Sequence, residues 1–194
     1  MICTIGRAHY ARPAPPSEDM EDMKELIQLF AQIALLRRGP QDLPASTLLL
    51  ALTVIGYLGV NLVVSSVLPP VKGWPAQVLV DTLFTLAWYV ALLRLLGRSE
   101  RILQTATAVF GLQGLLSPLL IASDWLMLRF GEDALWQVPV ACAGLLLIVW
   151  LVAANSQIVK AALEWSSPAS VVLVILQIFT GRLLLFALFP PVKA

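Results

Sequence analysis

Apolar residues in this chain gather into long runs instead of recurring at the spacing of an amphipathic helix. Five of these runs reach the length of about 20 residues that a helix needs to cross a hydrocarbon core. They extend over residues 45–68, 76–96, 102–123, 134–154 and 169–189. A backbone in lipid must satisfy its own hydrogen bonds, so runs of this length predict transmembrane helices. The predicted fold class is an all-α integral membrane protein, with a five-helix transmembrane bundle within residues 41–194.

Each predicted span is closed by residues that break helices or favour the membrane interface. The closing residues are Pro69 and Pro70, Gly97, Asp124, Asn155 and Ser156, and Pro190 and Pro191. Pro118 lies inside the third span, where the pattern predicts a kink.

Residues 1–22 combine three prolines with an acidic cluster and contain no apolar run, which predicts a disordered N-terminal tail. An alternative is that this tail is not part of the native protein, because Met20 and Met23 both offer start sites.

Residues 23–40 carry an amphipathic pattern that is too short and too polar to span a membrane. Leu26, Phe30, Ile33 and Leu36 share one helical face. The pattern predicts an interfacial amphipathic helix, whose terminal Arg37 and Arg38 face anionic headgroups. The alternative is a helix that only packs against the bundle and anchors the first span.

Charges in the loops predict the orientation of the spans. With the N-terminus in the cytoplasm, nine Lys and Arg residues fall on the inner side and three on the outer side. The nine inner residues are Arg7, Arg12, Lys24, Arg37, Arg38, Arg94, Arg98, Arg101 and Lys160. This asymmetry satisfies the positive-inside rule and places the C-terminus outside. We expect a multi-pass protein of a cell membrane, most simply a bacterial inner membrane.

The composition agrees with a membrane protein and excludes several classes of function. Hydrophobic residues make up 59% of the chain and charged residues 13%, against about 25% charged residues in a typical soluble domain. The net charge of +1 gives no basic excess for nucleic acid. One His and two Cys residues predict neither a metal site nor a cofactor site, and no motif for a catalytic residue occurs. The sequence therefore predicts a protein that is not an enzyme.

Only three of the 25 charged residues lie inside the predicted spans: Asp81, Arg94 and Arg182. Arg94 lies near the inner rim, whereas Asp81 and Arg182 fall at similar depths in the outer leaflet, together with Asn61 and Ser117. These four residues form a candidate intramembrane polar cluster, in which Asp81 and Arg182 are expected to pair. It is either a pocket or ion path open to the outside, or a set of contacts that fixes helix register.

Gly111, Gly114 and Ser117 recur at every third position of the third span. Small residues at this spacing permit two helices to approach closely, so they form a candidate helix-packing stripe. The spacing leaves open whether the neighbouring helix belongs to the same chain or to a second copy.

Two stretches resemble the Yip (Rab-interacting) membrane-protein domain and its uncharacterised bacterial relatives. They are residues 35–46, LLRRGPQDLPAS, and residues 101–111, RILQTATAVFG. The resemblance covers residue 24 to the C-terminus and implies five closely spaced helices behind a short cytoplasmic segment. It carries over no functional residue.

Two functions remain open from the sequence. One is a non-enzymatic adaptor, assembly factor or accessory subunit, which contacts a membrane-protein partner or a second copy through its helices in the lipid bilayer. The alternative is a small transporter or channel that uses the polar cluster around Asp81 and Arg182.

Overall fold

The computed structural model describes residues 28, 30–33, 39–66, 73–131, 133 and 135–190. Five long helices make up the bundle: α2 (Thr47–Ser65), α3 (Trp74–Leu95), α4 (Ile102–Phe130), α5 (Gln137–Leu163) and α6 (Ser167–Leu188). Two short 3-10 helices, η1 (Pro40–Asp42) and η2 (Ser99–Arg101), precede α2 and α4. The described part of the chain contains no strand, and the predicted all-α class is confirmed.

Four stretches are long and apolar enough to cross a membrane: α3, Ser99–Phe130, α5 and α6. The helix α2 is apolar over Thr47–Val63. Large apolar side chains on these helices point away from the bundle; Leu48 of α2 and Leu146 of α5 are 70% and 65% exposed. Exposed apolar faces of this length are compatible with a polytopic membrane protein.

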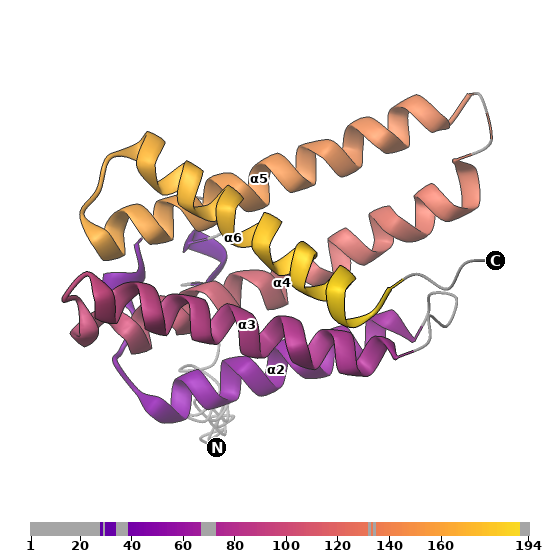
Figure 1. Cartoon of the computed structure of the whole chain (residues 1–194). Coiled ribbons are helices and arrows are strands. Elements are labelled where there is room, and N and C mark those ends of the chain that lie inside the picture. The colour runs from indigo at the N-terminus through magenta and orange to yellow at the C-terminus, as the bar shows by residue number, and fades with distance from the viewer. Residues whose placement is uncertain are drawn as a thin grey trace, which may run out of the picture.

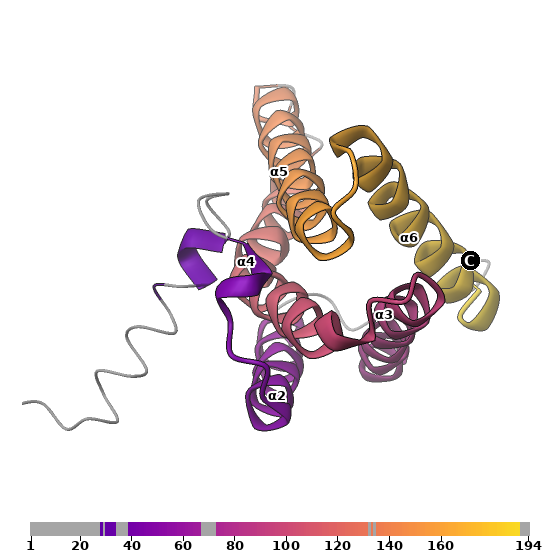
Figure 2. The ribbon, with the colours of Figure 1, turned by 90° about the vertical axis from the view of Figure 1, so that its left-hand side faces the viewer.

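The helix α4 occupies the centre of the arrangement. It contacts α2, α5, α3 and η1, while α6 packs against α5 and α3. Seen along the bundle, α2, α5 and η1 surround α4 (Figure 2). The helices α3 and α6 lie on the remaining side, where α3 contacts α2 and α6 contacts α5. We call the end where α3 and α5 finish and α4 and α6 begin the basic end, and the opposite one the far end.

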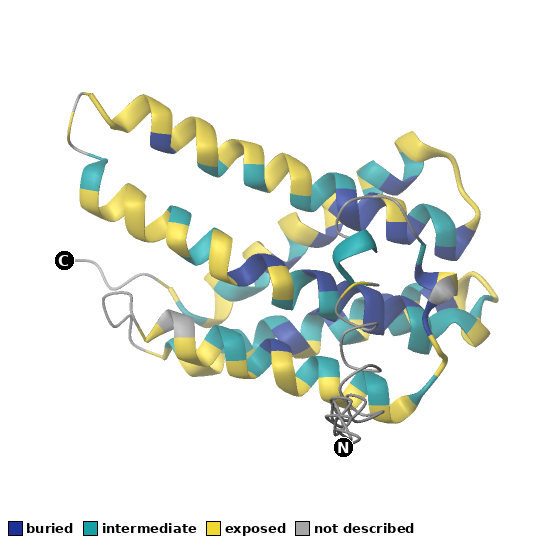
Figure 3. Ribbon diagram, turned by 180° about the vertical axis from the view of Figure 1, so that it is seen from behind, coloured by how far each residue is buried: buried dark blue, intermediate teal, exposed yellow. Residues whose placement is uncertain are grey.

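The buried core lies toward the basic end (Figure 3). It is built mainly from the last turns of α3 and α5 and the first turns of α4, including Leu93, Val109, Leu112, Ile158 and Val159. Toward the far end, α4 and α5 run beside each other as a hairpin that turns away from α2 and α3 (Figure 1). The basic end is therefore the tightly packed part of the molecule.

Two helices continue beyond the predicted spans. The helix α4 continues through Asp124 to Phe130, and α5 continues through Asn155 and Ser156 to Leu163. The Asn155 amide donates to the carbonyl of Leu151 (3.0 Å), and the Ser156 hydroxyl donates to that of Ala153 (2.7 Å). Because these side chains bond to their own helix, they do not end it.

The N-terminal segment packs against α4 through its apolar face. Ile33 is buried in the core, and the ring of Phe30 lies where a Cβ atom on Gly111 would be. This contact is the one expected if the segment packs against the bundle and anchors the first span. The predicted tail 1–22, its start sites, and Arg37 and Arg38 lie outside the described residues.

Candidate functional site

The predicted polar cluster contains a hydrogen-bonded junction between α2 and α4. The Asn61 amide donates to the Ser117 hydroxyl (3.1 Å) and to the carbonyl of Tyr57 in its own helix (2.8 Å). Ser117 is buried, and its hydroxyl donates to the carbonyl of Gln113 (2.7 Å). The Asn61 amide nitrogen and the Ser117 hydroxyl thus both have partners, so they can lie among apolar side chains.

Asp81 and Arg182 lie at matching depths but form no ion pair. They stand about 10 Å and about 9 Å from the far ends of α3 and α6 by helical rise. The described residues have ion pairs within 4.0 Å at Glu164 alone, so the expected pairing of these two charges is not formed. Arg182 is nevertheless near enough to interact electrostatically with the Asp81 carboxylate.

The orientation of α6 explains the separation of the two charges. A Cβ atom on Gly181 would lie 3.1 Å from the ring of Phe84, so Gly181 faces α3. The next residue, Arg182, is turned about 100° around the helix and is exposed. Instead, the hydroxyl of Tyr57 lies 3.4 Å from the Asp81 carboxylate, as a long hydrogen bond from α2 to α3.

The polar contacts of two tyrosines were not predicted from the sequence, because a tyrosine inside an apolar run was counted as apolar. Tyr57 contacts Asp81, and the hydroxyl of buried Tyr89 in α3 donates to the side-chain oxygen of Gln177 in α6 (2.7 Å). Gln177 could have indicated the second contact, because an amide within a span needs a hydrogen-bond partner.

The small-residue stripe is filled from within the same chain. Gly111 receives the Phe30 ring, Ser117 receives Asn61, and a Cβ atom on Gly114 would lie 3.7 Å from the Cα atom of Tyr57. The contacts of Gly114 and Ser117 bring the backbones of α2 and α4 together. Of the two arrangements that the spacing left open, the structure has the one within the chain.

A cluster of charged residues fastens two turns at the basic end. Glu164 follows the last turn of α5 and accepts hydrogen bonds from Arg98 (2.7 Å) and Arg101 (2.6 Å). Arg101 also donates to the carbonyls of Ala161 (2.8 Å) and Ala162 (3.2 Å), which belong to the last turn of α5. We call Arg98, Arg101 and Glu164 the clamp. It joins the α3–α4 turn to the α5–α6 turn and satisfies carbonyls that a helix end leaves unpaired.

The clamp lowers the pKa of the Glu164 carboxyl. The hydrogen bond from Arg101, together with its positive charge, holds the pKa of the Glu164 carboxyl below its usual value of 4.5, and Arg98 acts in the same direction. Glu164 adopts a left-handed backbone conformation with φ of 57°. The two arginines therefore hold an exposed acidic residue in a conformation that residues other than glycine rarely adopt.

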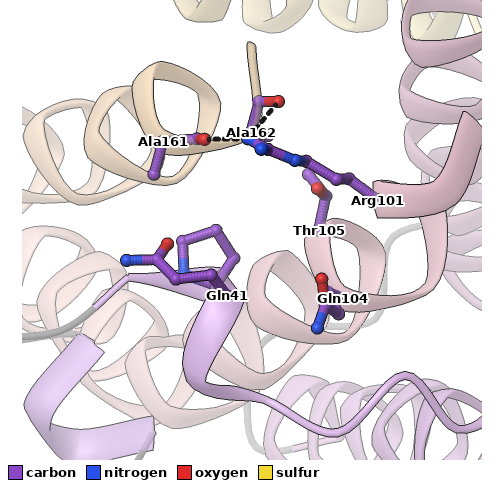
Figure 4. A pocket seen from close by; sticks show the side chains of 7 residues that line it. Gln41, Arg101, Gln104, Thr105, Ala161 and Ala162 are labelled. Carbon is purple, nitrogen blue, oxygen red and sulfur yellow. Dashed lines mark hydrogen bonds between the residues drawn. The ribbon is translucent and has the colours of Figure 1, made fainter. Parts of the chain in front are cut away.

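Behind the clamp lies a small cavity between η1, α4 and α5 (Figure 4). Its volume is about 170 Å³, counting the part that opens to the surface. Gln41, Arg101, Gln104 and Thr105 supply its polar side chains. The Gln104 amide also donates to the carbonyl of Leu43 (2.8 Å), which attaches the segment before α2 to α4.

The structure shows no group of three or more His, Cys, Asp or Glu residues placed to hold a metal ion within its described ranges. Cys142 is exposed on α5. The chain matches no protein-family profile, no curated protein and no solved structure.

Lowering the pH should weaken the clamp. Because the folded-state pKa of Glu164 is depressed, its stabilisation is present above about pH 4.5 and is lost as the pH falls through the folded pKa. The melting temperature of the wild type in detergent should therefore fall toward that of the E164Q variant as the pH is lowered. A matched control is E100Q, which changes an exposed carboxyl in η2. Parallel pH profiles for the wild type and E164Q would contradict the clamp.

Proposed function

We propose that this protein is a non-enzymatic polytopic protein of a bacterial inner membrane that works through helix–helix contacts with another membrane protein. It acts as an adaptor, an assembly factor or an accessory subunit. One observation carries the proposal: most of the surface of the far-end half of the α4–α5 hairpin is exposed and apolar.

Consecutive exposed positions show that little of the hairpin is covered by the rest of the bundle. Residues 124–129 of α4 are all exposed, and so are residues 135–139 and 141–143 around the start of α5, whereas Val140 between them is buried. Because a helix turn takes 3.6 residues, the six successive exposed positions of α4 include every side of that helix. In this half, Gly144 approaches Ser123, so the two helices contact each other.

The first half of α4 has no such free surface. It is buried from Thr105 to Phe110, and the small residues that follow are covered by Phe30, Tyr57 and Asn61. A partner helix would dock on the far-end hairpin, where apolar side chains such as Leu128 and Leu145 are exposed. Helices in lipid associate through close packing of such side chains.

The orientation and the resemblance to the Yip domain agree with this role. The clamp residues Arg98 and Arg101 are among the basic residues assigned to the cytoplasmic side, which would make the basic end cytoplasmic. A short cytoplasmic segment followed by closely spaced helices is the Yip-like arrangement, and we propose it for this chain.

A bulky side chain on the hairpin should release the partner. Ala143 is exposed on α5, and A143F adds a ring there without entering the core. The matched control is A51F, the same change at an exposed position of α2. After solubilisation of native membranes in mild detergent, A143F should lose most of a copurifying membrane protein that the wild type and A51F retain. Equal recovery with A143F and A51F would contradict docking on the hairpin.

A second candidate function, a small transporter or channel, is favoured by one specific observation. Asp81 is an ionisable residue inside an apolar helix, in contact with Tyr57 and within electrostatic range of Arg182. Ionisable residues in spans are expensive to insert and commonly mark ion or substrate pathways.

Transport would depend on the Asp81 carboxyl. In proteoliposomes with an imposed membrane potential and an internal pH dye, the wild type should conduct protons and D81N should lose that flux at equal reconstitution. The matched control is D124N, which changes an exposed carboxyl at the far end. A wild type that conducts no protons, or a D81N variant that keeps the wild-type flux, would contradict a transporter role that depends on Asp81.

A further inference from the structure

We propose that the cavity between η1, α4 and α5 is a binding site for an ordered water molecule, which Thr105 holds. The cavity is separate from the far-end hairpin and from the polar cluster around Asp81.

The first observation is the state of the Thr105 hydroxyl. Thr105 is 1% exposed, and its Oγ1 atom has no hydrogen-bond partner in the structure. A buried hydroxyl without a partner is costly, so native structures pair nearly all such groups with protein or with ordered water. Thr105 lines the cavity, and its side chain points toward it (Figure 4).

The second observation is the size and lining of the cavity. One water molecule needs about 10 to 15 Å³ of space for its centre and two to four polar partners. The cavity offers about 10 Å³ of such space, and the amides of Gln41 and Gln104 line it beside Thr105. It therefore has room for a single water and polar groups to hold it.

The charges of the clamp indicate a neutral ligand. The two terminal nitrogens of Arg101 are already bonded, one to the carbonyls of Ala161 and Ala162 and the other to Glu164. Hydroxyl and amide groups remain on the cavity wall, and these suit a small neutral molecule that both donates and accepts hydrogen bonds. Water meets these requirements.

A bound water would connect elements that share few direct hydrogen bonds. The bond from Gln104 to the Leu43 carbonyl attaches the segment around η1 to α4. Water between Thr105 and the lining amides adds a second polar connection at the same place. The site thus helps to hold the N-terminal segment on the bundle.

A neighbouring threonine offers a matched control. Thr107 is fully buried on the same helix, and its Oγ1 atom also has no partner, but it does not line the cavity. Replacing threonine by valine keeps the shape and removes the hydroxyl. The two substitutions should therefore have opposite effects if water is bound only at Thr105.

The test is thermal unfolding of the full chain in detergent. T105V should lower the melting temperature by about 2 to 4 °C, because the water loses a partner. T107V should leave the melting temperature unchanged or raise it, and T105S should stay close to the wild type. If T105V is as stable as T107V or more stable than the wild type, the water site is overturned.

A second measurement covers the case in which T105V does not fold. A crystal structure of the wild type at a resolution that shows ordered water should place a water within about 3.2 Å of the Thr105 Oγ1 atom. A Thr105 hydroxyl bonded to a protein group instead, with no water at the site, would overturn the proposal.

Discussion

The close approach of α4 to α2 at Gly114 is the contact on which the rest of the bundle depends. Because Gly114 has no side chain, the backbone of α4 can approach Tyr57 of α2. One turn further along, Asn61 reaches Ser117, so the two helices are held in register by a hydrogen bond. The ring of Tyr57 also packs against Phe110, with 5.5 Å between the ring centroids. Since α4 contacts α3, α5 and η1 as well, its register against α2 fixes the position of the whole bundle.

The two ends of the bundle are stabilised in different ways. Apolar packing and the clamp hold the basic end, where Leu93, Val109 and Ile158 are completely or nearly completely buried. The far end has polar contacts at Asn61 and Asp81 and a hairpin whose side chains are mostly exposed. This difference separates a closely packed part from an exposed apolar surface, which can contact lipid or another helix.

The helices themselves could be predicted because long apolar runs leave the backbone few alternatives in lipid. Their ends were harder to predict, since polar residues such as Asn155 and Ser156 bond to their own helix and do not stop it. The depth of Asp81 and Arg182 followed from helical rise, but the direction of Arg182 depends on Gly181 facing Phe84. The clamp joins residues 63 or more positions apart in the chain, so no local pattern could indicate it.

Cross-linking of α2 to α4 in intact membranes tests the central claim most directly. In a variant with Cys3 and Cys142 replaced by serine, N61C and S117C together should react with a short thiol cross-linker, because the native side chains lie 3.1 Å apart. With a protease site placed between α2 and α3, the cross-linked chain should still run as one band after cleavage. L62C with S117C is the control, because Leu62 is exposed on α2. Cross-linked dimers from S117C alone, or equal yields for the two pairs, would contradict the account.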